Sequence, residues 1–298
     1  MTTKIEWVKN PDGTPGETWN PTVGCTMSCG YCYMRDLHNR RHEARKQGKK
    51  MPACYRQRFE EPLCLPERLE KPLRWRKPRG VFVDSAGDLF DPAIPFEFIA
   101  AVFGVMAATP RHTFQVLTKR PERMAEWFRW YATLEHSPYD HHAQMRIEAG
   151  RMPLPNVWLG TTCEDQQRYD ERAGYLLDCP AALHFVSFEP LLGHIVIPPE
   201  HVCRYRSHAS GLTYTNRGAS GWPDADRISG LGWAIVGGET GPGARPMHPD
   251  WARSLRDQCQ AAGVSFFYKQ GPGDHGLALR KMPALDGRTW DEMPRRAP

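Results

Sequence analysis

Three cysteines close together in the sequence are the side chains best suited to chemistry. Cys25, Cys29 and Cys32 lie in the run WNPTVGCTMSCGYCYM, with Tyr31 directly before the last of them. Three thiolates in one short loop can hold three irons of a cubane four-iron four-sulfur cluster and leave the fourth iron open to a substrate or cofactor. The alternatives are a zinc site, which normally needs four ligands and finds no second close-spaced pair here, and three unrelated thiols.

The composition favours a large cytoplasmic α/β domain. The chain has 298 residues, a length that fits one barrel-sized domain with insertions as well as it fits two domains. Nine cysteines occur without an apolar N-terminal segment or an apolar run long enough to cross a membrane. Because thiols in a reducing compartment serve metals rather than disulfides, we expect a cytoplasmic protein with no membrane partner.

Positive charge is concentrated directly after the cysteines. Residues 35–79 hold fifteen Lys or Arg against six Asp or Glu, a net charge of +9, whereas the whole chain carries +5. A basic segment beside a catalytic site could grip a phosphate backbone, and a solvated charged helix with a linker is an equally common alternative. The cations that we expect to contact nucleic acid are Arg40, Arg41, Arg45, Lys49 and Lys50.

Short apolar segments alternate with stretches of helical period, which predicts βαβ units and a parallel sheet. Helical periodicity covers residues 99–106 and 124–131, and Pro95 and Pro121 suit the first turns of those helices. Because no G-x-G-x-x-G opens any helix, the repeated units predict a complete or partial TIM-type (β/α) barrel with insertions, in a single domain over residues 1–298. A weak strand leads into Cys25, and the other expected strands cover residues 80–85, 113–118, 157–162, 184–189, 233–239 and 265–270.

Polar residues recur at the predicted ends of the strands, where barrel enzymes keep their active sites. Helix caps and loop starts also favour these residue types, which is the structural alternative. The resulting candidates are Ser85, Gly87, Asp88, Lys119, Arg120, Thr161, Thr162, Cys163, Glu164, Ser187, Glu189, Gly238 and Glu239.

Two segments interrupt the alternation of strand and helix. Residues 196–232 lack periodicity and predict an irregular insertion, and long loops of this kind are usually functional or disordered. Residues 136–155 form a second polar stretch. It contains His136, His141 and His142, but no carboxylate or cysteine spacing accompanies them, so we do not expect a metal site there.

Several unusual phrases occur along the chain in a fixed order: VDSAGDLF, VLTKRPERM, LGTTCED, VSFEPLLG and VGGETGPGARPMHPDW, followed by a helix and FFYKQ. Together with the cysteine spacing they resemble a radical SAM-related family of phage and bacterial genomes, and the resemblance runs through most of the chain. It implies a barrel of the radical SAM kind, a 4Fe-4S cluster, S-adenosyl-L-methionine (SAM) as cofactor, and an electron donor such as flavodoxin or ferredoxin. A phage-encoded member would act in the host cytoplasm.

The resemblance also implies roles for individual residues in binding SAM. Residues 85–88 would occupy the loop that grips the methionine amino group, although their sequence departs from the commoner Gly-Gly-Glu. Lys119 or Arg120 would pair with the methionine carboxylate through a charge-assisted hydrogen bond. Thr161, Thr162 or Glu164 would bind ribose hydroxyls, and Gly238 and Glu239 lie where adenine contacts are common. Tyr31, Ser187 and Glu189 complete the implied cofactor-binding set.

The remaining cysteines have less definite roles. Cys163, at a predicted strand end, could return a hydrogen atom to a product radical or could be a small buried hydrophobic residue. Cys54 and Cys64 could contribute to a second cluster, but two ligands do not make a site.

Radical SAM chemistry begins when one electron breaks the C5′–S bond of the cofactor and forms a 5′-deoxyadenosyl radical. The favoured function is modification of a nucleic-acid base, a thymine-derived base in phage DNA, by rearrangement (an isomerase activity) or carbon–carbon bond formation. The basic segment, the phage association of the family and the likeness to radical SAM enzymes that act on thymine in DNA motivate it. The alternatives are a radical enzyme acting on a peptide or small metabolite, and a non-catalytic cluster-bearing binding protein.

Overall fold

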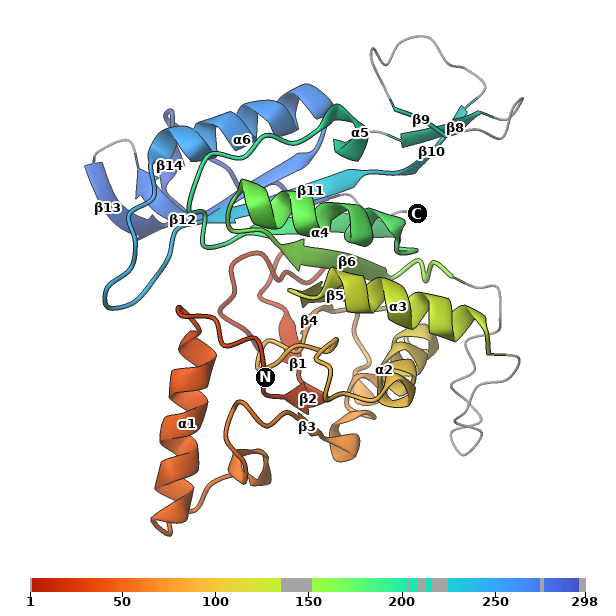
Figure 1. Ribbon diagram of the computed structural model, residues 1–298, viewed down its shortest axis with the longest axis vertical. Helices are drawn as coiled ribbons and strands as arrows, with labels where there is room; N and C mark the ends of the chain where they lie inside the picture. The colour runs from red at the N-terminus through yellow and green to blue at the C-terminus, as the bar shows by residue number, and fades with distance from the viewer. Residues whose placement is uncertain are drawn as a thin grey trace. The chain divides into compact units, whose positions relative to one another are not determined.

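The protein has an α/β fold, as the alternation of strand and helix predicts. The computed structural model describes residues 2–134, 152–202, 204–207, 213–215, 225–273 and 276–294. Its contacts divide the chain into two compact units, residues 1–158 with 180–182, and residues 159–179 with 183–298. Each unit combines parallel strands with helices (Figure 1). Within the described residues, no helix has both the length and the apolar character that crossing a membrane requires.

The first unit is built on three parallel strands. β1 pairs with β4, and β4 pairs with β5, so that the order in space is β1-β4-β5. The weak strand expected before Cys25 is therefore present, and the two strands expected next along the chain are confirmed. Their bounds are Glu17–Trp19 for β1, Gly80–Val83 for β4 and Thr113–Thr118 for β5.

Two helices complete the apolar core of this unit. They are α2 (Phe96–Ala108) and α3 (Pro121–Ala132), both predicted from their periodicity. The fully buried Trp127 of α3 packs on Phe103 of α2 with ring centroids 4.4 Å apart, and its Nε1 donates to the Phe96 carbonyl at 3.1 Å. Pro121 occupies the first turn of α3 as expected, whereas Pro95 precedes α2 as its N-cap residue.

The segment after the cysteines forms helix α1 (Tyr33–Lys46), which stands apart from α2 and α3 in the view of Figure 1. Its inner face is polar: His38 lies 3.0 Å from the Gln57 carbonyl and His42 lies 3.1 Å from the Tyr55 carbonyl. Short elements follow, and β2 pairs antiparallel with β3. They are β2 (Thr22–Val23), η1 (Ala53–Tyr55), β3 (Leu63–Cys64), η2 (Pro66–Arg68) and η3 (Pro72–Arg74).

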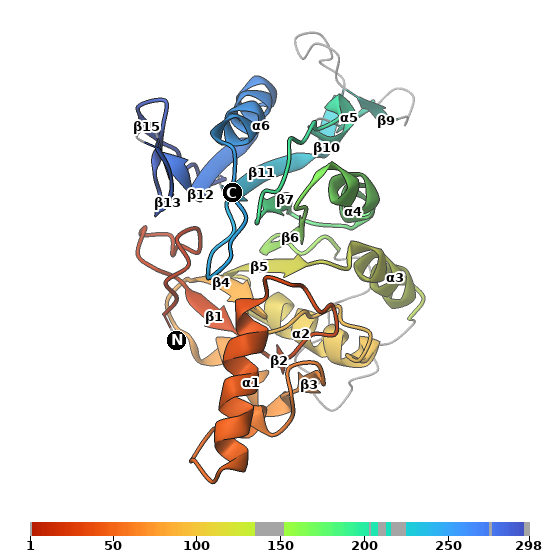
Figure 2. The same cartoon turned by 60° about the vertical axis from the view of Figure 1, so that its left-hand side comes forward.

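The second unit repeats the parallel plan. β7 pairs with β11, and β11 pairs with β12, all parallel, while β13 runs antiparallel to β12. Helix α6 packs against β12, and α4 contacts β7 (Figure 2). The bounds are β6 Val157–Thr162, which crosses the division, α4 Gln166–Asp178, β7 Leu183–Phe188, β11 Leu231–Gly237, α6 Pro249–Ala262, β12 Ser265–Gly273 and β13 Gly276–Lys281.

The insertion at 196–232 is more regular than the sequence predicts, and the expectation of an irregular segment is wrong for its described part. Helix α5 (Pro199–Val202) precedes a three-stranded antiparallel sheet of order β10-β8-β9. Its strands are β8 (Arg204–Ser207), β9 (Thr213–Thr215) and β10 (Ala225–Ser229). They are short and polar, so they lack the apolar alternation that reveals a strand in sequence. The three histidines at 136, 141 and 142 lie outside the described residues.

A hairpin near the end of the chain was also not predicted. β14 (Ala284–Leu285) pairs with β15 (Arg288–Thr289) across Asp286 and Gly287, whose φ angles are 55° and 74°. An Asp-Gly pair with two positive φ angles is the preferred two-residue hairpin turn, so a sequence signal existed.

Within the described residues, the strands of neither unit close on themselves into a barrel.

His112 ties the η3 segment to the strands of the first unit. Its Nδ1 accepts a hydrogen bond from the Arg79 backbone N–H at 3.2 Å, and its Nε2 lies 3.2 Å from the Pro72 carbonyl. These contacts define a neutral ring with its proton on Nε2. Burial, reinforced by the charge of Arg111, lowers the pKa of His112 from 6.5 to about 4.

We expect His112 to make folding less favourable in acid. Between pH 6.5 and about 4 the unfolded chain protonates this ring while the folded chain holds it neutral, so stability falls as the pH falls through that window. His112→Gln removes the titration but keeps an acceptor and a donor. In urea unfolding at a series of pH values, the wild type should lose stability relative to this variant below pH 6.5, with the difference at pH 8 as the reference. Parallel pH profiles would contradict this assignment.

Candidate metal and cofactor site

The three cysteines lie in one loop, residues 24–32, which we call the cysteine loop. Its beginning runs beside the turn that follows β4: Gly24 forms a parallel bridge with Gly87, and its N–H donates to the Ala86 carbonyl at 3.0 Å. The N–H of Cys25 donates to the Phe59 carbonyl at 2.9 Å. Backbone hydrogen bonds therefore fix the first cysteine between two segments of the first unit.

Two glycines allow this close approach. Gly24 has a φ of 97°, and a Cβ at this position would lie 2.6 Å from the Phe59 oxygen. A Cβ on Gly87 would lie 2.9 Å from the Gly24 oxygen. Neither contact is tolerable for an ordinary side chain, so both positions need glycine. Gly30, in the same loop, has open space around it.

Asp84 holds the residues that lead into the loop. This buried carboxylate accepts from the Thr22 N–H at 3.0 Å and from the Thr22 hydroxyl at 2.9 Å. Burial raises its pKa to about 8. Asn20 acts beside it, because its Oδ1 accepts from the Ser85 hydroxyl at 3.1 Å and from the Ala86 N–H at 3.2 Å.

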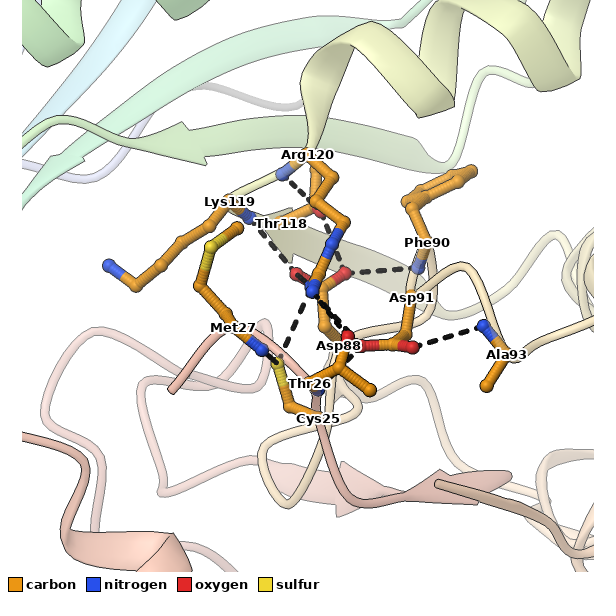
Figure 3. A network of polar contacts seen from close by, with 10 residues as sticks. All are labelled: Cys25, Thr26, Met27, Asp88, Phe90, Asp91, Ala93, Thr118, Lys119 and Arg120. Carbon is orange, nitrogen blue, oxygen red and sulfur yellow. Dashed lines mark hydrogen bonds and ion pairs between the residues drawn. The ribbon is translucent and has the colours of Figure 1, made fainter. Parts of the chain in front are cut away.

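Arg120, two residues after the end of β5, lies at the centre of the polar network that holds the Cys25 end of the loop (Figure 3). Its Nη1 lies 3.4 Å from the Cys25 Sγ and 3.5 Å from Asp88 Oδ2. Its Nη2 donates to the Thr26 hydroxyl at 2.8 Å and lies 3.2 Å from Asp91 Oδ2. Arg120, Asp88 and Asp91 are all buried, which makes these charge-assisted contacts strong.

The two carboxylates of the network also bind backbone and hydroxyl groups. Asp88 accepts from the Thr118 hydroxyl at 2.7 Å, from the Lys119 N–H at 3.1 Å and from the Phe90 N–H at 3.0 Å. Asp91 accepts from the Thr26 N–H at 2.8 Å and from its hydroxyl at 2.9 Å. The network therefore joins the cysteine loop to the loops that follow β4 and β5.

The thiols of Cys25 and Cys32 accept N–H donors. The Met27 N–H lies 3.4 Å from the Cys25 Sγ, and the Arg35 N–H lies 3.4 Å from the Cys32 Sγ, where Cys32 caps α1. Burial raises the pKa of both thiols, to about 11 for Cys25 with the charge of Asp88 adding to the effect. A bound metal ion deprotonates a coordinating thiol, so a metal at these sulfurs would favour the thiolate over the protonated thiol.

The donor type, three cysteine thiols in one short loop, is the one that an iron–sulfur cluster uses, although the described residues do not gather these thiols into a metal-binding group. Three half-buried thiols share one short loop, and N–H groups already point at two of the sulfurs, which is the hydrogen bonding that tunes cluster thiolates. In the described parts of the chain, no three His, Cys, Asp or Glu side chains are gathered closely enough to bind a metal ion.

Tyr31 and Lys119 form a second link between the cysteine loop and the end of β5. The Lys119 Nζ donates to the Tyr31 hydroxyl at 3.0 Å and lies 5.2 Å from the centre of its ring. A cation over an aromatic face is electrostatically favourable. The structure thus brings together the predicted residues Tyr31, Asp88, Lys119 and Arg120 around the cysteine loop.

Apart from Ser85 and Gly87, which lie in the turn after β4, the other predicted cofactor residues lie in the second unit. Thr161, Thr162, Cys163 and Glu164 are buried where β6 ends, and Arg172 of α4 donates to the Thr162 carbonyl at 2.7 Å and to Glu164 Oε2 at 2.9 Å. Glu164 therefore forms an internal ion pair. Cys163 is fully buried, and its N–H donates to the Ser187 carbonyl at 3.0 Å.

A further polar group in the second unit lies at the ends of β7 and β11 and on β12. Ser187 donates to Glu189 Oε2 at 3.3 Å, and the Lys269 Nζ lies 2.9 Å from Glu189 Oε1. Gln270 donates to the Gly238 carbonyl at 2.8 Å. Glu239 points elsewhere, toward the exposed Arg245, whose Nε lies 2.6 Å from its carboxylate.

Sequence reasoning missed four residues that hold the loop: Asn20, Thr22, Thr26 and Asp91. Asp91 carried a usable signal, because it precedes Pro92 three residues after Asp88 and follows a predicted strand end. The other three precede or separate the cysteines, where the sequence predicts only a weak strand. Their partners lie more than sixty residues away in the chain, so only the folded structure identifies their roles.

The fold and the loop define an α/β protein with a three-cysteine candidate metal site. A family model described as "Protein of unknown function (DUF5131)" matches residues 2–294. The match covers nearly the whole chain, and the protein therefore belongs to this family. Searches of curated proteins and of solved structures found no match.

Gly24 gives the sharpest test of how the loop is held. Gly24→Ala should lower the free energy of unfolding by about 1–3 kcal/mol, because it places a Cβ against the Phe59 oxygen and strains the positive φ. Gly30→Ala is the matched control within the same loop and should change stability by less than about 0.5 kcal/mol. Chemical denaturation of both variants checks this. Equal effects would show that the approach at Gly24 is not constrained.

Proposed function

We propose that this protein is a radical S-adenosylmethionine enzyme that binds a 4Fe-4S cluster through Cys25, Cys29 and Cys32 and modifies a nucleic-acid base. The observation that carries the proposal is the cysteine loop, whose first thiol is fixed by backbone hydrogen bonds and by the Arg120 network. Its spacing resembles that of radical SAM enzymes, and the strands beside it are parallel, with β4 and β5 ending near the loop. We further propose a partial TIM-type barrel of the radical SAM kind as the architecture.

The residues of the first unit would bind and orient the cofactor. The bound cluster would supply the electron that cleaves SAM to a 5′-deoxyadenosyl radical. Lys119, which is half-buried and already donates to Tyr31, could also donate to a carboxylate of the cofactor. Ser85 and Gly87 lie in the turn beside the loop, where the Ser85 hydroxyl, which donates to Asn20 Oδ1, could approach the methionine end.

Helix α1 provides the best candidate surface for a nucleic acid. Arg40, Arg41, Arg45, Lys49 and Lys50 are exposed, and Tyr33, directly after Cys32, is 66% exposed. Exposed cations can bind phosphates, and an exposed aromatic ring can stack on a base that has left the helix.

Two cations in the second half of the basic segment, Arg68 and Arg79, serve the fold instead. Trp75 packs edge-on against His112 at 5.5 Å, and the Arg79 guanidinium lies 5.3 Å from its ring. Arg79 also pairs with Glu17, and Arg68 donates to the Asn20 carbonyl at 3.3 Å. We therefore place the proposed phosphate contacts on α1 and the residues directly after it, where five exposed cations follow the cysteine loop.

The reaction itself is tested by SAM cleavage. Anaerobically reconstituted and reduced wild-type protein should release 5′-deoxyadenosine, and the Cys25→Ala, Cys29→Ala, Cys32→Ala triple variant should release none, because it lacks the cluster ligands. Cys179→Ala is the matched control, since this cysteine lies outside the cysteine loop and its sulfur donates to the Tyr175 carbonyl in the second unit. Chromatography of the products measures the outcome. A cluster-loaded wild type that cleaves no SAM with any substrate would favour a cluster-bearing binding protein.

The nucleic-acid substrate is tested by charge reversal. Replacing Arg40, Arg41, Lys49 and Lys50 by Glu should weaken DNA binding by at least about tenfold and flatten its dependence on salt, because fewer phosphates are neutralised. The control carries the same net charge change at cations outside the segment, namely Lys4, Arg129, Arg168 and Lys281. Fluorescence anisotropy across a salt series measures both. Unchanged affinity in the first variant would exclude this surface and favour a peptide or small-metabolite substrate.

A further inference from the structure

We infer that Arg120 is a positioning residue that clamps the Cys25 end of the cysteine loop for cluster binding, rather than a ligand of the cofactor carboxylate. The effects of the clamp on the cluster rest on the proposed function, whereas the contacts of Arg120 are a property of the folded chain. Lys119, directly after β5, is then the residue that we propose to pair with the cofactor carboxylate.

The contacts of Arg120 all lie within the protein. One side of the guanidinium faces the Cys25 sulfur and Asp88, and the other faces Thr26 and Asp91. The side chain is 9% exposed, and those of Asp88 and Asp91 are 7% and 0% exposed. A cofactor carboxylate at this group would have to displace one of two buried carboxylates, which would then lose its cation.

The planar fork of arginine suits this position. Its two terminal nitrogens reach four partners at once, and a lysine ammonium, as a single point on a flexible stem, cannot do so. Arg120 therefore sets the position of Thr26 and of the sulfur beside it. In a loaded site, a positively charged N–H donor to the Cys25 sulfur would stabilise the more negative, reduced cluster and raise its reduction potential.

The clamp can be measured first without any cluster. Hydrogen exchange of the full-length apo-protein should be about tenfold faster in the peptide containing residues 24–27 of Arg120→Lys than of wild type, with other peptides unchanged. Arg79→Gln is the matched control, because Arg79 is a partly buried arginine paired with Glu17 away from the cysteine loop. Wild-type exchange in Arg120→Lys would overturn the clamp.

The loaded protein supplies the second readout. Arg120→Lys should retain the cluster about tenfold more weakly in a chelator challenge, and its EPR-monitored midpoint potential should fall below that of wild type and of Arg79→Gln. Arg120→Gln should show larger changes, because it also leaves two buried carboxylates without their cation. Wild-type potential and retention in the lysine variant would overturn the effect on the cluster.

Thr26→Val keeps the test decisive if both Arg120 variants fail to fold. It removes the hydroxyl that accepts from Arg120 and donates to Asp91, and it should accelerate exchange in the same peptide. Unchanged exchange in this variant would count against the clamp.

If wild-type protein binds no cluster while the exchange differences are present, the proposed function fails and the clamp holds. If the cluster forms and SAM is cleaved but exchange and potential do not respond to Arg120, the clamp fails and the proposed function holds.

Discussion

The structure around the cysteines depends on one buried cation between two buried carboxylates. Arg120 pairs with Asp88 and Asp91, and burying such charges is unfavourable unless every lone pair is satisfied. Here the requirement is met by hydroxyl and backbone donors from the cysteine loop and from the ends of β4 and β5. The residues that satisfy the charges are therefore held in one arrangement, and the loop containing Cys25 is among them.

This constraint explains why the loop needs no regular secondary structure to be well defined. Gly24 and Gly87 let two backbone segments approach, Asp84 fixes Thr22, and the Arg120 network fixes Thr26. The first thiol lies between these anchors, whereas Cys32 caps α1. A site held at both ends can keep its thiols partly accessible, as reaction with a cofactor would require.

Helix α1 follows the loop directly and has an unusual inner face. It binds the segment after it through His38, Asn39 and His42 rather than through aliphatic packing, and Asn39 accepts from the Phe59 N–H at 2.8 Å. Phe59 also receives the Cys25 N–H through its carbonyl. Phe59 therefore links α1, which carries exposed cations, to the first cysteine. The same residue supports both the helix that would bind a nucleic acid and the start of the cysteine loop.

Local periodicity and spacing are enough to predict the α/β class, the positions of six strands and two helices, and the three-cysteine loop. The sequence also identified Asp88, Lys119 and Arg120 as strand-end residues. Only the tertiary structure decided what they contact, and it alone identified Thr26 and Asp91, whose interaction joins residues 65 positions apart. The polar strands of the insertion also escaped prediction. The physical reason is the same in each case: pairing of polar groups depends on distance in space, and a single sequence records only distance along the chain.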